Sequence, residues 1–136
     1  MEELFENDIL GRIGTQKYLC NITWRNGQFL MDEPTNVGGK DLGMDPFSTL
    51  MASLAGCTLS TLRMYIDRKE WIIPEINISL NLYQETEGEL TTTIRRNITF
   101  SGEVTAEQKE RLLIIADKCP ISKLLKGKTI INTNTL

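Results

Sequence analysis

One long helix is the sequence feature that most constrains how this chain can fold. Asp45 and Pro46 form a typical helix start, because aspartate caps free backbone N–H groups and proline at the first helical position has no N–H to leave unpaired. From Phe47 to Leu62, apolar and small residues cover almost every face of the predicted helix. A chain of 136 residues has little material to surround such a helix. We therefore expect an obligate homodimer, in which a second subunit supplies part of the cover.

Strands and shorter helices are expected on both sides of this helix. The predicted strands alternate apolar and polar residues. They span Tyr18 to Trp24, Phe29 to Met31, Ile76 to Leu82 and Leu90 to Phe100, with a candidate last strand from Thr129 to Asn132. Asn26-Gly27 predicts a type I′ hairpin turn between the first two, and Gly88 marks the turn between the next two. Helices are expected from Thr105 to near Cys119 and from Pro120 to Lys126. This order indicates a single α+β domain, residues 1–136, with antiparallel sheets.

Composition argues against several classes of function. The net charge of −3 offers no basic surface for nucleic acid. The chain has no histidine, so a Ser-His or Cys-His catalytic pair cannot be built, and its three cysteines lack the paired spacing of a zinc site. We expect no metal and no cofactor. The acidic first residues and the lack of a long apolar run predict no export signal and no membrane span, so the expected location is cytoplasmic.

Two cysteines are the candidates for chemistry. Cys57 lies inside the long helix among small residues, where it is either a small buried hydrophobe or a thiol that needs a cation from elsewhere. Cys119 precedes Pro120 at the predicted start of the last helix, where free N–H groups and two nearby lysines favour a thiolate. Local electrostatics alone makes Cys119 the better nucleophile, although a plain capping role fits its position equally well.

Two arginines are candidates for the cation that a reactive thiolate requires. Arg25 lies at the predicted hairpin turn, where a solvated turn residue is the simpler interpretation. Arg96 interrupts an apolar strand face, so it must pair or reach an edge, and a structural ion pair would explain it as well. The candidate carboxylate partners are Glu33, Asp41, Asp45 and Asp67. Cys20 lies on the core-facing side of its strand, and we expect it to pack there.

Two motifs of the sequence are similar to those of one known family. The run from Asp45 to Cys57 resembles the central helix of the OsmC/Ohr family, the osmotically inducible and organic hydroperoxide resistance proteins. The run from Ala116 to Ile121 resembles the second cysteine motif of that family. Shorter matches are Asp32-Glu33-Pro34, Gly38-Gly39, Thr61 to Tyr65 and Asp67-Arg68-Lys69. The resemblance runs from about Tyr18 to about Thr133 and keeps the two cysteine motifs in the family's order.

This resemblance implies a fold, an assembly and a reaction. It implies antiparallel sheets around a long central helix, in an intertwined homodimer whose active sites lie at the subunit interface. Cys57 would attack the O–O bond of an organic hydroperoxide and become a sulfenic acid, and Cys119 would condense with it to a disulfide that a dithiol reductant resets. Arg25 would support the Cys57 thiolate, because its hairpin is similar to the family's Arg-Asp-Gly hairpin, and Arg96 is the alternative.

The sequence departs from the family at one position. Members usually carry a carboxylate just after the proline that begins the central helix, where it pairs with the active-site arginine, but this chain has Phe47 and Ser48 there. Two functions therefore stay open, beside the alternative of a purely structural dimer. The first is a thiol-dependent peroxidase that acts on organic hydroperoxides. The second is an OsmC-like dimer with weak or no peroxidase activity that binds an apolar small molecule or acts as a redox sensor.

Overall fold

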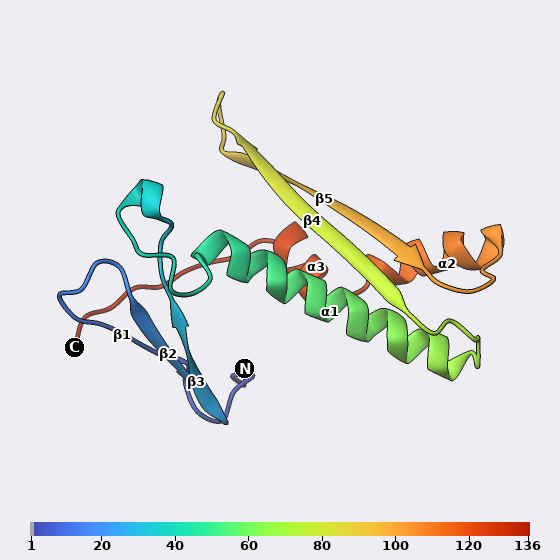
Figure 1. The fold of residues 1–136 in the computed structure, drawn as a ribbon, viewed down its shortest axis with the longest axis horizontal. Helices are drawn as coiled ribbons and strands as arrows, with labels where there is room; N and C mark the ends of the chain where they lie inside the picture. The colour runs from blue at the N-terminus through green and yellow to red at the C-terminus, as the bar shows by residue number, and fades with distance from the viewer. Residues whose placement is uncertain (1) are drawn as a thin grey trace. The chain divides into compact units, whose positions relative to one another are not determined.

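The first half of the chain is built on a small antiparallel sheet. The structure is a computed structural model that describes residues 2–136 (Figure 1). It separates into two compact units, one ending at Leu50 and the other beginning at Met51. The sheet of the first unit has the order β1-β2-β3, with bounds Leu10–Ile13, Cys20–Trp24 and Gly27–Met31. The sequence predicts β2 and β3 but misses β1, whose four residues are all exposed and show no apolar alternation.

A tight turn joins β2 to β3. Trp24 pairs with Gly27, so the two residues of the turn are Arg25 and Asn26, one position earlier than the Asn-Gly pattern predicts. Neither turn residue has a positive φ, so the type I′ turn that this pattern favours is not the one formed. The turn places Arg25 at the tip of the hairpin.

The loop that follows β3 is organised around one buried carboxylate. Asp32 is 2% exposed, and its two oxygens accept backbone N–H groups from Tyr18, Glu33, Lys40 and Leu42. The loop contains a short 3-10 turn, η1 (Thr35–Val37), which ends at Gly38 with a φ of 105°. At Gly39 a Cβ would lie 2.0 Å from the carbonyl oxygen of Glu33, so only glycine fits there. This loop is therefore a compact, internally bonded structure.

The long helix forms as predicted. Helix α1 (Pro46–Arg68) begins where Asp45 Oδ2 accepts the backbone N–H of Ser48 at 3.1 Å. Its buried residues form one stripe: Leu54, Thr58, Leu62, Tyr65 and Ile66. Other apolar residues of the helix are exposed, including Phe47 at 54% and Met64 at 69%. One chain therefore covers only part of this helix.

The second sheet is a long hairpin. Strands β4 (Ile76–Glu85) and β5 (Thr91–Phe100) pair antiparallel along their full length, and the turn between them contains Gly88, whose φ is 79°. The alternation that the sequence predicts is confirmed, because the half-buried positions are Ile76, Ile78, Leu80 and Leu82 on β4 and Ile94, Arg96, Ile98 and Phe100 on β5. Arg96 is the one charged side chain in these two rows.

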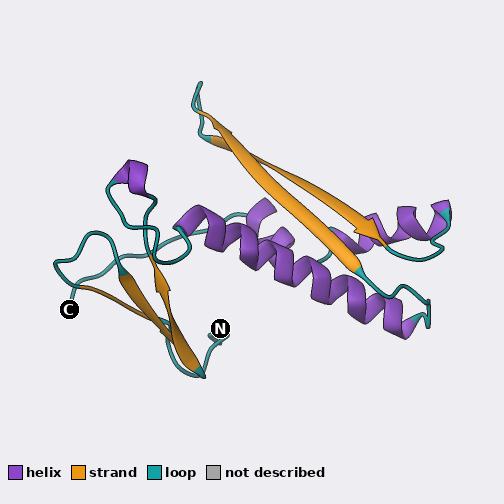
Figure 2. Ribbon diagram, viewed as in Figure 1, coloured by secondary structure: helices purple, strands orange, loops and turns teal. Residues whose placement is uncertain are grey.

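Two helices complete the second unit (Figure 2). Helix α2 (Ala106–Ala116) begins with the predicted capping box between Thr105 and Gln108, and helix α3 (Pro120–Lys126) follows it closely. The core joins α1, α2 and the loop before β4 through the buried residues Leu62, Tyr65, Ile66, Ile73, Leu112, Ile115 and Ala116. Ile98 and Phe100 of β5 pack against it.

The predicted last strand is wrong. Residues 128–136 have no regular structure, and Ile130 and Ile131 are 70% and 83% exposed. A strand needs a neighbour to receive its backbone hydrogen bonds, and this segment pairs with none of the strands described here. The observed fold is otherwise the expected α+β arrangement with antiparallel sheets.

Candidate active site

The two cysteines that the sequence singles out lie together in the second unit. Cys57 lies in the middle of α1 and is half-buried, whereas Cys119 is the N-cap residue of α3 and is fully buried. Each thiol shifts the pKa of the other, which requires close approach, and both are free rather than joined. The fold therefore brings together two residues that are far apart in the sequence.

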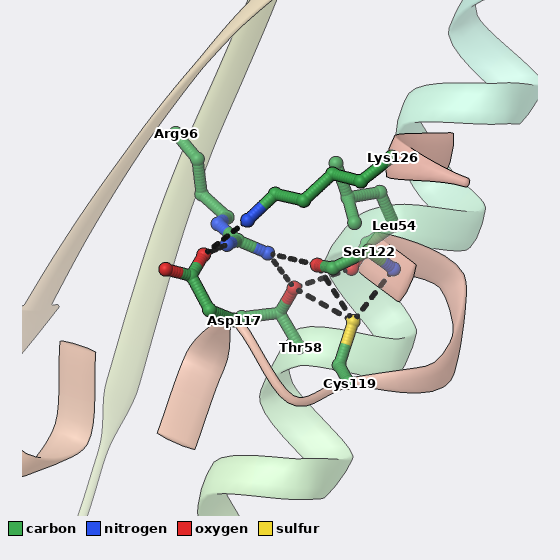
Figure 3. Close-up of polar contacts among 7 residues, drawn as sticks. All are labelled: Leu54, Thr58, Arg96, Asp117, Cys119, Ser122 and Lys126. Carbon is green, nitrogen blue, oxygen red and sulfur yellow. Dashed lines mark hydrogen bonds and ion pairs between the residues drawn. The ribbon is translucent and has the colours of Figure 1, made fainter. Parts of the chain in front are cut away.

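Hydrogen-bond donors surround the Cys119 sulfur (Figure 3). Its Sγ accepts the backbone N–H of Ser122 at 3.3 Å, as expected of a capping side chain, and lies 3.1 Å from the Ser122 hydroxyl. The hydroxyl of Thr58, from α1, lies 3.8 Å away. Thr58 and Ser122 are themselves buried, at 0% and 4% exposure. The sulfur therefore lies in a closed polar environment.

Arg96 reaches this environment from β5. Its side chain is 15% exposed, and Nη1 donates to the hydroxyls of Thr58 and Ser122 at 2.9 and 2.8 Å. Nη2 donates to Asp117 Oδ1 at 2.9 Å, and Lys126 Nζ reaches the same oxygen at 3.1 Å. The expectation that Arg96 must pair or reach an edge is confirmed by this ion pair.

The carboxylate partner of Arg96 is one that the sequence does not predict. The candidates were Glu33, Asp41, Asp45 and Asp67, but the partner is Asp117, which directly follows α2. Asp67 instead pairs with Arg63 one helical turn away, and Asp45 caps α1. A signal was present, because Asp117 belongs to the same short motif as Cys119.

The two thiols differ in which protonation state their surroundings favour. Burial raises the pKa of Cys119, but the hydroxyl and N–H of Ser122 and contacts with Cys57 and Thr58 outweigh it and lower that pKa to about 7. Burial raises the pKa of Cys57, and interaction with Cys119 raises it further. The first negative charge of the pair therefore resides on Cys119, as the local electrostatics of the sequence suggests.

The other two residues named from the sequence belong to the first unit. The guanidinium of Arg25 lies over the ring of Trp24, 5.1 Å from its centroid, which is a cation–π contact. Cys20 is half-buried on β2, and its thiol lies 3.6 Å from the carbonyl oxygen of Tyr18. Both contacts are local, so the role of Arg25 toward Cys57 stays a prediction.

A cleft of about 560 Å³ opens beside the thiol environment. Its apolar lining comes from several elements and includes Leu54, Ile94, Ile98, Leu113 and Leu125. Its polar lining includes Arg96, Asp117, Ser122 and Lys126, but neither cysteine is among the lining residues. The cleft therefore combines apolar and charged lining residues.

Residues 2–136 contain neither a potential metal-binding cluster nor a membrane-spanning helix. Within this part of the chain, no cluster of three or more His, Cys, Asp or Glu side chains is placed to hold a metal ion. No helix in the same range has the length and apolar character needed to cross a membrane.

Known structures share this fold. An OsmC-like protein from Mycoplasma pneumoniae superposes with a TM-score of 0.76 at 18% identity, covering 92% of this chain and 90% of the other. An organic hydroperoxide resistance protein from Elizabethkingia anophelis gives 0.70 at 22% identity, covering 93% and 92%. An organic hydroperoxide resistance protein OsmC from Legionella pneumophila gives 0.70 at 17% identity, covering 93% of each chain. Likeness at such identities establishes the fold alone.

Sequence comparison identifies the family directly. Comparison with curated protein sequences finds no significant match. The family model described as OsmC-like protein, however, matches residues 38–134, which is well over half of the chain and includes both Cys57 and Cys119. This chain therefore belongs to the OsmC-like protein family.

Proposed function

We propose that this protein is a thiol-dependent peroxidase that reduces organic hydroperoxides through Cys57 and Cys119. The observation that carries the proposal is the pairing of these two free thiols, one buried among hydrogen-bond donors and the other more accessible. Membership of the OsmC-like family supports it, as do two structural neighbours named organic hydroperoxide resistance proteins.

Accessibility supports the proposed division of roles within the pair. Cys119 is fully buried, so a peroxide meets the half-buried Cys57 first. The Cys57 thiolate attacks one oxygen of the hydroperoxide, the O–O bond breaks, and the products are a cysteine sulfenic acid and an alkoxide that takes up a proton to become an alcohol. Cys119 then attacks the Cys57 sulfur, releasing hydroxide and forming a disulfide, which a dithiol reductant returns to two thiols.

Arg25 is the proposed cation beside the Cys57 thiolate. If it lowers the pKa of Cys57, Arg25→Ala slows peroxide consumption far more at neutral pH than at a pH high enough to ionise Cys57 without help, which lies above the ordinary cysteine range because burial raises this pKa. A control is Arg12→Ala, which removes an exposed charge from the same sheet. An equal loss of rate at both pH values would contradict an effect of Arg25 on the pKa of Cys57. An unchanged rate would assign the support of the thiolate to another residue.

We also propose that residues 1–136 act as one OsmC-like domain in an intertwined cytoplasmic homodimer. The incomplete cover of α1 supports the dimer, because Phe47, Leu50 and Met64 remain 54%, 41% and 69% exposed. Isolated exposed apolar residues are ordinary, but several large ones on one long helix favour a protein interface.

A second function is favoured by the cleft and by the missing carboxylate at positions 47 and 48. In that case the protein binds an apolar small molecule, or senses oxidants, with weak or no peroxidase activity. The cleft supports this alternative because its apolar lining would hold a hydrocarbon chain while Arg96 and Lys126 offer positive charge in the same lining.

A thiol count separates the peroxidase from the binding function, and repeated turnover with a dithiol separates it from a sensor that reacts only once. Fully reduced protein is mixed with cumene hydroperoxide, and the free thiols per chain are counted before and after with the alcohol product measured in parallel. A peroxidase loses two thiols, forms one equivalent of alcohol per turnover and recovers with a dithiol. The control Cys20→Ser should lose the same two thiols. Retention of all three thiols in the unaltered chain would rule out peroxidase chemistry and leave the binding function.

A further inference from the structure

Arg96 makes more hydrogen bonds than its ion pair with Asp117 requires. Only Nη2 faces the carboxylate of Asp117, whereas Nη1 donates to two buried hydroxyls, those of Thr58 and Ser122. Both hydroxyls lie beside Cys119 Sγ, at 3.8 and 3.1 Å. The guanidinium itself makes no hydrogen bond to this sulfur among residues 2–136, so any effect on it passes through the hydroxyls.

The single proton of each hydroxyl can be assigned from these contacts. Thr58 donates to the carbonyl oxygen of Leu54 at 2.7 Å, so its proton is engaged there. Ser122 Oγ accepts from Arg96 at 2.8 Å, which leaves its own proton free to point at Cys119 Sγ. The backbone N–H of Ser122 points at the same sulfur. One serine therefore directs two donors at Cys119, and the arginine fixes the orientation of one of them.

We infer that Arg96 is a positioning residue that acts through the Ser122 hydroxyl to place the negative charge of the cysteine pair on Cys119. Charged donors strengthen the hydrogen bonds of the groups they polarise, and a buried thiolate needs such donors to persist. Asp117 holds the second guanidinium nitrogen, so that the first faces the two hydroxyls. This inference rests on the proposed peroxidase reaction for its use, but the charge placement itself does not depend on peroxide.

Four charged or titratable side chains, each from a different part of the second unit, face the Cys119 environment. They are Cys57 on α1, Arg96 on β5, Asp117 after α2 and Lys126 on α3. Asp117 reduces the positive field of Arg96, and Lys126 restores part of it. Because Lys126 and Asp117 are 64% and 58% exposed, solvent screens both, whereas the Arg96 side chain is only 15% exposed. Arg96 is therefore the dominant fixed charge next to the two hydroxyls.

The consequence concerns the second step of the reaction. After Cys57 becomes a sulfenic acid, Cys119 must attack the Cys57 sulfur as a thiolate, forming the S–S bond while the S–O bond breaks and hydroxide leaves. A thiolate that is already present makes this attack without first losing a proton. Loss of Arg96 should therefore slow disulfide formation and let the sulfenic acid accumulate.

Thiolate titration tests the charge placement without any peroxide. Cys119 is left as the single thiol by Cys20→Ser and Cys57→Ser, and its ionisation is followed by ultraviolet thiolate absorbance. In this background Arg96→Gln and Ser122→Ala should each raise the pKa toward the ordinary cysteine value of about 8.5. The control Arg95→Gln, which removes the exposed neighbouring arginine, should leave it unchanged. A folded Arg96→Gln variant with an unchanged pKa, or an equal rise in Arg95→Gln, would overturn the inference.

Trapping provides the second test, in the chain with Cys57 and Cys119 intact. After one equivalent of cumene hydroperoxide, Arg96→Gln should give severalfold more dimedone adduct at Cys57 than the unaltered chain. Arg96→Lys should give an intermediate amount, because lysine keeps the positive charge but not the planar set of N–H donors. Equal trapping in all variants would overturn the inference. If Arg96→Gln does not fold, Ser122→Ala decides both tests. A shifted pKa in a chain that consumes no peroxide would refute the peroxidase and keep the charge placement.

Discussion

Reactivity in this cysteine pair is divided between two residues. Cys57 is the thiol that a peroxide can reach from solvent. Cys119 has the surroundings that favour a thiolate, with a pKa of about 7. The motif resemblance assigns the first attack to Cys57, whereas local electrostatics assigns the resting charge to Cys119. These two statements agree if the pair shares one proton, which must move to Cys119 before Cys57 attacks a peroxide. Variants in which one cysteine is replaced by serine distinguish the roles.

Cys57→Ser should abolish peroxide consumption. Cys119→Ser should react once and stop as a sulfenic acid on Cys57, because no thiol remains to resolve it. Consumption of cumene hydroperoxide and dimedone labelling measure the two outcomes. Cys20→Ser serves as the matched control and should behave like the unaltered chain. Exchange of the two outcomes would make Cys119 the peroxide-reacting residue.

The pH dependence of disulfide formation follows from the pKa of Cys119. Because that pKa is lowered to about 7, the thiolate is present above this pH and is protonated below it. After Cys57 is oxidised, the rate of disulfide formation should be nearly constant at high pH and fall about tenfold for each pH unit well below 7. Stopped-flow measurement of the second kinetic phase checks this. A rate that keeps rising above pH 8 would indicate an ordinary, unshifted thiol.

At the scale of single elements, the loop from Asp32 to Leu42 depends on one carboxylate. Burial raises the pKa of Asp32, but the four backbone N–H groups that it accepts outweigh burial and lower that pKa below 3.8. The stability contributed by Asp32 is therefore fully present above about pH 4 and is lost as the pH falls through its folded pKa. This loop should open in acid before ordinary surface loops do.

Asp32→Asn tests that expectation at neutral pH. An amide keeps one acceptor oxygen but adds an NH₂ group that faces backbone donors, so the bonds to Lys40 and Leu42 should be lost or weakened. Amide hydrogen exchange at these two residues should accelerate at least tenfold. Asp41→Asn is the control, because Asp41 has a φ of 55° and asparagine tolerates that conformation. Unchanged exchange at Lys40 and Leu42 would contradict the role given to Asp32.

At the scale of the whole molecule, the exposed apolar residues of α1 predict how the chain assembles. The family match from residue 38 to 134 includes parts of both compact units, and α1 contains the boundary between them. The exposed apolar residues of this helix predict a dimer that persists at micromolar concentration, measured by light scattering. Leu54 is 3% exposed, so Leu54→Glu should leave the chain insoluble or unfolded. A monomer, or a soluble and stable Leu54→Glu variant, would count against this view.

Local sequence patterns determined most elements, because caps, turns and alternation act over a few residues. Residues close together in the sequence form each of these patterns: the Asp45-Pro46 helix start, the Thr105–Gln108 capping box and the alternation of β4 and β5. The two cysteine motifs also determined the family from sequence alone. The strand expected at residues 129–132 failed because a strand depends on a partner, and its own sequence does not show whether one is present.

Only the tertiary structure decided how the thiols are supported. Arg96 has to be compensated wherever it lies, but the choice of Asp117 over four other carboxylates depends on how β5 packs beside α2 and α3. Likewise, Thr58 and Ser122 are ordinary helix residues until packing places both hydroxyl oxygens against Arg96 and beside Cys119. Electrostatic effects fall off with distance in space rather than along the chain, so the sequence can name the charged residues but not the contacts that determine their effect.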